Sequence, residues 1–558
     1  MTRGEEGKRG AADMEEAESA LMNDKTKIGL RVLEAGLLIG LLSDALLRAA
    51  PWGLNVLLWT GAVVVAMIAV KRRKGAAFGR EWHVFAASAI VFAAFLSWRD
   101  SFVLRSLDVL AVLAMLSLAA YQSHNNRMRL AGILDYVVGL VTAGFGALFN
   151  MFPLLLNDIE WKSLPRNGWS RHVWAVLRGA IVAVPLLFIF GGLLMAADAV
   201  FNNLVLRSFN FDIGDLFSHF LFATFMFWLA CGFLRGSVAE GMRIKFDNPF
   251  SPTLNVLSIS PAEAGGEPAS PAKLFSLGIV ETCVVLGSVN LLFLIFVLVQ
   301  LRYFFGGAEV VLSTTGLSYS EYARSGFFEL VWATWLVLPL LLIAHWLLRK
   351  ERPSHERIFR FLAGFQIALL FVVIWSAVGR MRLYQSEYGL TELRFYTTAF
   401  MGWLSLVFVW FAATVLRGQR ERFAFGALVA GCFVIFALHA INPDALIART
   451  NAQRALAYGR HDNFDAAYAA SLSADAVPEL LVALPTLSER DRQAVAGKIL
   501  EQRATTESFD WRSWNLARWR AQKAVRSNEP VLRAMLASPL LSEESPASTS
   551  NLSVEHED

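Results

Sequence analysis

The residues in this sequence most able to do chemistry are ionisable side chains inside or beside long apolar runs. Glu281 lies near the start of one run and His345 near the end of another, while Arg302, Glu329 and Asp198 lie close to the ends of runs. A charged group at bilayer depth costs about 2.5–3.5 kcal/mol on insertion scales, so it normally finds a partner. These five residues form a candidate intramembrane polar site, which could carry protons or cations or could pack helices through hydrogen bonds.

Helix geometry predicts how four of these residues pair. Along a helix that rises 1.5 Å per residue, Glu281 lies about 31 Å from Arg302, and His345 lies about 24 Å beyond Glu329. In two antiparallel neighbouring spans, Arg302 would meet Glu329 near one membrane surface and bind it through two hydrogen bonds. Glu281 would meet His345 near the other surface. A proton site and a helix-packing contact remain alternatives for this second pair.

A second candidate is an aromatic and charged block between two apolar runs. Gly306 and Gly307 end the first run, and Ser318 with Glu321 has the S-x-x-E spacing of a helix capping box. Aromatic residues are common at membrane–water interfaces. We expect either an ordered re-entry of the chain into the bilayer or a surface for a substrate or partner. The block consists of Tyr319, Glu321, Tyr322 and Arg324.

Two pairs of opposite charge lie three positions apart within apolar runs. They are Arg31 with Glu34 and Arg105 with Asp108. Side chains three apart share one face of a helix, so we expect each pair to neutralise itself locally.

The motifs of soluble enzymes are missing from this sequence. It contains no Walker A, GxSxG or HExxH pattern, and its three cysteines lie in apolar runs without CxxC spacing. The sequence therefore predicts no catalytic residue, no metal site and no cofactor. The net charge of +4, from 51 basic and 47 acidic residues, gives no reason to expect a nucleic-acid partner.

The composition is that of a membrane protein. Of the 558 residues, 55% are hydrophobic and 18% are charged, and the mean hydropathy is +0.46. The apolar runs are about 20 residues long, enough for a helix to cross the hydrocarbon core. The predicted fold is an all-α, polytopic bundle of 11 or 12 spans. The expected spans are 28–48, 52–70, 82–98, 102–121, 174–199, 213–234, 274–302, 326–348, 358–380, 393–416 and 422–441.

The twelfth candidate, 131–156, decides the topology. It contains three glycines with Asn150 and Pro153, a pattern typical of a re-entrant or interfacial element. If it does not cross, every basic loop faces the cytoplasm, as the positive-inside rule requires. We therefore favour 11 crossings, a cytoplasmic N-terminus and an extracytoplasmic C-terminus, with 12 crossings as the alternative. The basic loops are Lys71–Glu81, Arg127–Arg129, Lys162–Arg171, Arg235–Lys245, Arg349–Arg357 and Arg417–Arg422.

Composition also divides the chain. We predict a polar tail at 1–27, a first membrane part at 28–156, and a membrane core at 157–441 with a Pro-rich linker at 246–273. Residues 442–535 are predicted to form a small soluble helical domain, which starts at Asn442-Pro443 and contains a capping pair, Ser488 and Asp491. This domain is the candidate site for a protein partner. Residues 536–558 are expected to be a disordered tail.

Four blocks resemble an uncharacterised family of bacterial multi-pass membrane proteins classed as a domain of unknown function. They are FGGLLMAADAVF (190–201), QLRYFFGG (300–307), the EYAR–GFFEL block (319–330) and NPDALIARTN (442–451), and the resemblance covers roughly 170–480. Ser320 and Ser325 stand where the family pattern has Ala and Arg, and Ala199 where it has Pro. The resemblance implies a bacterial inner-membrane protein and carries no activity.

Three functions are consistent with these features. The first is a structural, sensory or regulatory protein of the bacterial plasma membrane whose C-terminal helices present an extracytoplasmic interaction surface. The second is a secondary transporter or channel with an intramembrane polar path. The third is a membrane-embedded enzyme acting on a lipid-linked substrate. The lipid bilayer itself is the one partner common to all three.

Overall fold

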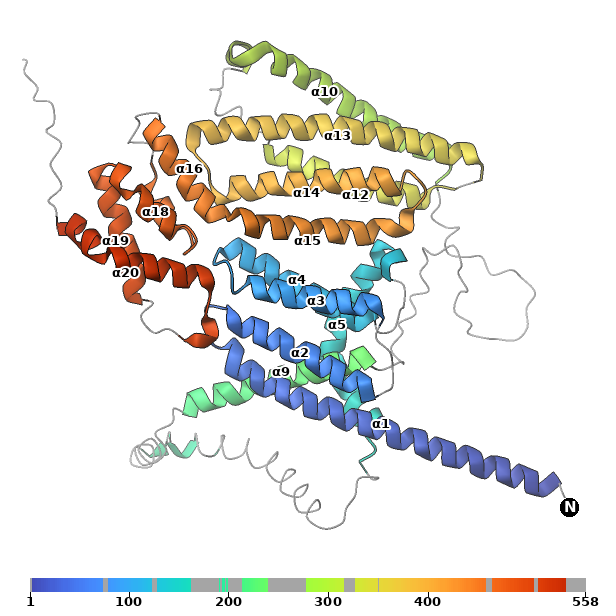
Figure 1. The fold of residues 1–558 in the computed structure, drawn as a ribbon. Helices are drawn as coiled ribbons and strands as arrows, with labels where there is room; N and C mark the ends of the chain where they lie inside the picture. The colour runs from blue at the N-terminus through green and yellow to red at the C-terminus, as the bar shows by residue number, and fades with distance from the viewer. Residues whose placement is uncertain are drawn as a thin grey trace, which may run out of the picture.

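A computed structural model shows a bundle of long helices with a cluster of shorter helices at one end (Figure 1). It describes residues 3–73, 79–122, 128–161, 190, 193–195, 197–198, 213–238, 277–315, 327–349, 351–457, 464–505 and 510–537. Within these ranges the secondary structure is helical, with one isolated β-bridge and no strand. The predicted all-α class is confirmed.

The helices before residue 442 are α1 (Arg3–Leu47), α2 (Leu54–Arg73), α3 (Arg80–Phe95), α4 (Phe102–Gln122), α5 (Ile133–Phe149), α6 (Met151–Pro153), α9 (Ile213–Val238), α10 (Ile279–Thr315), α12 (Phe327–Leu347), α13 (Pro353–Tyr388), α14 (Glu392–Thr414) and α15 (Phe423–Ile441). Those that follow are α16 (Pro443–Ala457), α17 (Ala466–Ser471), α18 (Val477–Ala483), α19 (Glu489–Thr505) and α20 (Leu516–Ala537), with a short 3-10 turn, η7, at Trp511–Ser513.

Eight of the described helices are long and apolar enough to cross a membrane, or up to nine if a bent pair counts as one span. The eight are α2, α4, α9, α10, α12, α13, α14 and α15. The expected spans 28–48 and 82–98 are helical, within α1 and α3, but are not among the eight. The expected span 174–199 lies almost wholly outside the described residues. Many large apolar side chains on these helices are exposed, such as Phe102 at 74%, as lipid-facing residues are.

The bundle has two halves joined by α15. One hydrophobic core is formed by α1–α4, α9 and the α5 region, and it includes Ala424 from α15. A second core is formed by α10 and α12–α15, and it includes Phe423. Figure 1 shows α15 lying between α14 and the α3–α4 pair. Contacts that decide how the two halves fit together therefore pass through α15.

Consecutive helices in the bundle are antiparallel, so their connections lie at two ends. The α1–α2 and α3–α4 connections lie at one end with α16–α20, and we call this the tail end. The basic loops lie at the other, which we call the basic end. There Arg129 forms an ion pair with Glu81 at 3.7 Å, and its guanidinium lies 5.6 Å from the ring of Phe425 in α15. Backbone hydrogen bonds of Leu277 with Leu347 and Arg349 lie at the same end of the second half.

The ambiguous segment 131–156 forms α5 and a bent continuation, with 51° between the two parts. Its start lies beside Arg129 at the basic end. Its end returns to that end, because Asp158 accepts a hydrogen bond from Arg235 at 2.6 Å and Glu160 N donates to Thr26 Oγ1 at 3.1 Å. Figure 1 shows α5 running across the neighbouring helices. A helix pair bent in this way is either a broken span or a re-entrant loop, and the sequence favours the element that does not cross.

The helices after residue 441 share a hydrophobic core of their own, which runs from Ile447 to Leu532 and includes Leu390 and Phe395 from the α13–α14 turn. At the start of α19 the Asp491 N–H donates to Ser488 Oγ at 3.2 Å, so the predicted cap by Ser488 is confirmed. The Ser488 hydroxyl in turn donates to the Asp491 carboxylate at 2.7 Å. Pro443 begins α16, as predicted. Asn442, however, adopts a left-handed backbone (φ 58°) that ends α15 instead of capping α16 with its side chain.

A close helix contact in the first half depends on Gly36 and Gly40 of α1, a G-x-x-x-G pair that faces α9. A Cβ added at Gly40 would lie 2.8 Å from the carbonyl oxygen of Ala223, whereas a Cβ at Gly61 of α2 meets nothing within 4 Å. We expect Gly40→Ala to destabilise the protein by about 1–3 kcal/mol through overpacking. The control Gly61→Ala should be neutral or stabilising, by up to about 1 kcal/mol. Thermal unfolding in detergent measures both, and equal melting temperatures would contradict this packing.

The two ends of the bundle can be distinguished by chemical labelling. In a background without Cys231, Cys283 and Cys432, we expect single cysteines at Glu351 and Gln419 to behave alike, because both lie at the basic end. A cysteine at Lys498 should show the opposite accessibility to a membrane-impermeant maleimide. From the positive-inside rule, Lys498→Cys is the variant labelled from outside intact cells. Labelling of all three from the same side would contradict the assignment of the two ends.

Candidate functional site

The residues predicted to form the second-half polar site are only partly described. Glu281 lies in the first turn of α10 and is exposed, whereas His345 of α12 is 4% exposed, with its ring 5.0 Å from that of Phe359. Both lie at the basic end, as the helix arithmetic predicts. Glu329 is exposed in the first turn of α12, and the Arg302 side chain lies outside the described residues. The two predicted pairs therefore remain predictions.

Of the other site residues predicted from the sequence, only Asp198 lies within the described residues. Asp198 is exposed, and its backbone N–H donates to Leu194 at 3.0 Å. The block Tyr319, Glu321, Tyr322 and Arg324 lies outside the described residues. Among the residues that are described, no three His, Cys, Asp or Glu side chains converge as a metal site requires. The clearest constellation of buried charge lies elsewhere, at the tail end.

Its first element is a buried pair between the two halves. Asp108 of α4 and His439 of α15 lie 3.0 Å apart, with side chains 1% and 0% exposed. His439 Nδ1 lies 2.9 Å from the carbonyl oxygen of Ile435, and its ring stacks on Phe95 at 4.4 Å. Both ring nitrogens of His439 therefore face an oxygen acceptor, one on its own helix and one on α4.

This contact corrects the expected local pairing of Arg105 with Asp108. Arg105 instead lies 3.5 Å from Asp100, one turn earlier, at the membrane-proximal loop. Asp108 pairs with His439 and not with Arg105, because α15 packs against α4 and places the fully buried His439 ring beside it. The other local pair, Arg31 with Glu34, is confirmed at 2.7 Å.

Arg99 connects this pair to the C-terminal helices. Its Nε donates to the carbonyl oxygen of His439 at 2.9 Å, and its terminal nitrogen lies 3.1 Å from the carboxylate of Asp475. The guanidinium also packs over Trp98, 4.9 Å from the ring centroid. Asp475 accepts a further hydrogen bond from the Asp100 backbone N–H at 2.7 Å. One arginine in the α3–α4 loop thus joins α15 to the loop before α18.

A second set of contacts attaches the start of α20. Asn515 Nδ2 donates to the carbonyl oxygens of Leu96 and Arg99, both at 2.8 Å. Arg518 lies 3.5 Å from Asp100 and donates to the backbone carbonyl of Trp52 at 2.9 Å. These bonds satisfy the open carbonyls at helix ends, which have no partner within their own helix. The α1–α2 and α3–α4 connections are therefore both covered by α20.

Three aspartates gather at this junction. Burial raises the pKa of Asp100, Asp444 and Asp475 above the ordinary value. Repulsion from Asp100 raises the pKa of Asp444 and Asp475 further. Attraction acts in the opposite direction. Arg518 and Arg105 lower the pKa of Asp100, and Arg99 lowers the pKa of Asp475. Asp444 accepts from the Ser473 N–H at 3.3 Å. One carboxylate oxygen of each of Asp100, Asp108 and Asp444 is buried without a hydrogen-bond partner, so ordered water is expected beside them.

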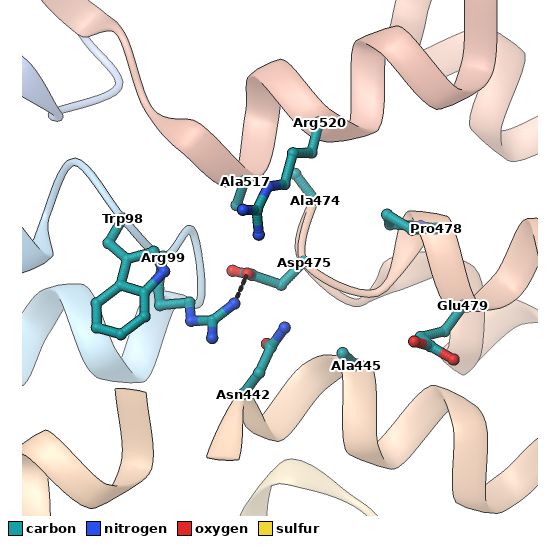
Figure 2. Close-up of a pocket in the computed structure, with 10 residues that line it drawn as sticks. All are labelled: Trp98, Arg99, Asn442, Ala445, Ala474, Asp475, Pro478, Glu479, Ala517 and Arg520. Carbon is teal, nitrogen blue, oxygen red and sulfur yellow. Dashed lines mark hydrogen bonds and ion pairs between the residues drawn. The ribbon is translucent and has the colours of Figure 1, made fainter. Parts of the chain in front are cut away.

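A cavity of about 200 Å³ adjoins the network (Figure 2). It lies between the α3–α4 loop and the helices α16, α18 and α20. Its lining residues are Trp98, Arg99, Asn442, Ala445, Ala474, Asp475, Pro478, Glu479, Ala517 and Arg520. Asp108, His439, Arg99 and Asp475 thus form one continuous chain of contacts beside this cavity.

A family model described as a domain of unknown function, DUF4153, matches residues 86–482. The chain belongs to this family. The DUF4153 match begins earlier than the resemblance in sequence blocks suggests, so it includes Arg99 and Asp108 as well as His439 and Asp475. Arg518 and Arg520 lie beyond it. No curated protein and no solved structure matches the chain.

Sequence reasoning missed most of this site. It identified Asp108 as an intramembrane charge but assigned it a local partner, and it did not single out Arg99 or Asp475. One feature of the sequence could have indicated the site. The polar stretch Trp98–Ser101 joins two apolar runs, and so short a connection keeps its charged side chains close to the ends of both helices. Asp475, 376 positions away, carries no local signal of this contact.

The aspartate cluster predicts a measurable pH dependence. The pKa of Asp444 is raised on folding, so the folded protein binds protons more readily, and stability rises as the pH falls from 7 toward the ordinary aspartate pKa of about 3.9. Asp444→Asn carries no charge at any pH and should reduce this rise in melting temperature. The control Glu501→Gln, at an exposed ion pair, should keep it. Identical slopes for wild type and Asp444→Asn between pH 7 and pH 5 would contradict this account.

Proposed function

We propose that this protein is a structural, sensory or regulatory protein of the bacterial plasma membrane, in which helices 442–535 form an extracytoplasmic unit coupled to the spans. The observation that carries the proposal is Arg99. It contacts α15 of the bundle and Asp475 of the C-terminal helices with one guanidinium. A movement of these helices therefore acts directly on the end of α15, beside the buried pair of Asp108 and His439.

The proposed orientation rests on charge. The basic loops described lie at the end opposite α16–α20, and basic loops are typically cytoplasmic. Trp161 lies at the basic end and Gly214 near the tail end. From the sequence, the apolar run 174–199 between them is predicted to cross. With α1 and α3 as spans, this supports 11 crossings, a cytoplasmic N-terminus and an extracytoplasmic C-terminus.

The partners of the buried carboxylates at the junction favour a regulatory role over a membrane-embedded enzyme. Asp100 and Asp475 bind arginines of the same chain, and Asp444 accepts from a main-chain N–H. This arrangement is typical of an interface that holds two parts of a protein together. Exposed apolar side chains on the C-terminal helices, including Val482 at 77% and Val531 at 52%, support a protein partner there.

The transporter alternative has one specific observation in its favour. Asp108 and His439 form a buried carboxylate–imidazole pair between two spans, and such pairs occur in proton relays. The two functions differ in proteoliposomes. A proton flux in the wild type that is lost in Asp108→Asn would favour transport, whereas no flux in either protein would favour the regulatory role.

The proposal is tested by Arg99→Gln, which removes the charge that joins the two parts. We expect the variant to insert normally but to show faster hydrogen exchange in 464–505 and at the end of α15, because Asp475 loses its buried cation. In cells it should reproduce the transcript profile of a strain lacking the protein. The matched control is Arg490→Gln on the exposed face of α19.

Two results would contradict the proposal. One is unchanged hydrogen exchange in Arg99→Gln, which would mean that Arg99 does not couple the parts. The other is faster exchange with a wild-type transcript profile, which would mean that the coupling is not needed for function.

A further inference from the structure

The cavity at the junction lies where four elements meet. Trp98 and Arg99 come from the α3–α4 loop, Asn442 and Ala445 from the end of α15 and the start of α16, Glu479 from α18, and Arg520 from α20. Sites between two parts of a protein are common positions for small-molecule binding. A molecule bound here would touch both the spans and the C-terminal helices.

The charges that line this cavity are balanced but not all paired. Arg99 and Asp475 neutralise each other at 3.1 Å. Arg520 and Glu479 remain, and neither has a hydrogen bond or ion pair within the described part of the chain. Figure 2 shows them on different sides of the cavity, Arg520 reaching in from α20 and Glu479 from α18. The cavity thus offers one available cation and one available anion, separated from each other.

The size of the cavity limits what can occupy it. The cavity has a volume of about 200 Å³. It is smaller than the 300 Å³ or more of sites for drug-sized ligands. A nucleotide or an oligosaccharide is too large, whereas an amino acid or a lipid headgroup has suitable dimensions.

We propose that this cavity binds a small zwitterion, a molecule with one primary ammonium group and one carboxylate or phosphate. Glu479 accepts hydrogen bonds from the ammonium group, and the guanidinium of Arg520 donates to the anionic group. Asn442 and the wall of Trp98 complete the site. The proposal rests on the proposed function and deepens it, because such a ligand is the signal that the C-terminal helices would detect.

Simpler ligands fit the same charges less well. A lone anion could reach Arg520 but would lie near Asp475 and Glu479, and a lone cation would lie near Arg99 and Arg520. A quaternary ammonium group has no N–H to donate to Glu479. The shared chemistry has two sources, a free amino acid and the headgroup of an aminophospholipid at the membrane surface.

The test uses the full chain in nanodiscs of phosphatidylcholine, with binding measured by calorimetry. The probes are L-alanine and O-phosphoethanolamine, compared with acetate and ethylammonium, which carry one charge each. We expect at least one zwitterion to bind and the single charges to bind about tenfold more weakly or not at all. Binding of L-alanine identifies a free amino acid. Binding of O-phosphoethanolamine that is lost in nanodiscs containing phosphatidylethanolamine identifies the lipid headgroup, because the lipid already fills the site.

Two variants assign the contacts. Arg520→Gln and Glu479→Gln should each weaken binding about tenfold or more, since each removes a charge-assisted hydrogen bond. The matched control Arg526→Gln, an exposed arginine further along α20, should bind like the wild type. Melting temperatures of all three variants verify that the fold is intact. Of the two substituted residues, Arg520 is exposed and Glu479 is half-buried.

The proposal is overturned if neither zwitterion binds at up to about 10 mM, if acetate or ethylammonium binds equally well, or if both substitutions leave binding unchanged. These outcomes are separate from a failure of the proposed function. If Arg99→Gln still uncouples the C-terminal helices while no zwitterion binds, the coupling stands and the ligand assignment falls.

Discussion

The tail end of this structure depends on the buried positive charge of Arg99, which cannot be removed by deprotonation. The guanidinium of Arg99 stays protonated in proteins, and its side chain is only 10% exposed. Leaving such a group without partners costs about 3–5 kcal/mol, so the carbonyl of His439 and the carboxylate of Asp475 must both be in place. These two partners belong to α15 and to the loop before α18. The requirement of one side chain therefore fixes how the C-terminal helices sit on the spans.

The same requirement reaches the seam between the two halves of the bundle. His439 offers its backbone to Arg99 and its ring to Asp108, so α15 is held to the α3–α4 loop and to α4 at adjacent points. The ring nitrogen on the far side lies 2.9 Å from the carbonyl oxygen of Ile435. A change at Asp475 can alter this pair through one intervening residue. That short chain of contacts gives the proposed regulation a physical route.

Membership of the DUF4153 family places these contacts within one unit. The matched region, 86–482, contains Arg99, Asp108, His439 and Asp475, and it extends past the end of the spans into α18. The first C-terminal helices and the part of the bundle from α3 onward therefore belong to the same family domain, whereas α1 and α2 precede the match. Two arginines lie beyond residue 482. Arg518 binds Asp100 and the carbonyl of Trp52, and Arg520 lines the cavity. The proposed ligand site thus combines family residues with residues outside the match.

Local order was accessible from the sequence, because it depends on neighbours along the chain. Run length predicted the apolar helices, S-x-x-D spacing predicted the Ser488 cap, and glycines with Asn150 and Pro153 indicated a break within 131–156, where the structure bends by 51°. The tertiary structure alone decided the partners of buried charges. Asp108 took His439 instead of Arg105, and Arg99 took Asp475 at a separation of 376 residues. No local pattern encodes such a pairing, because the free energy that selects it arises only when packing removes water from both groups.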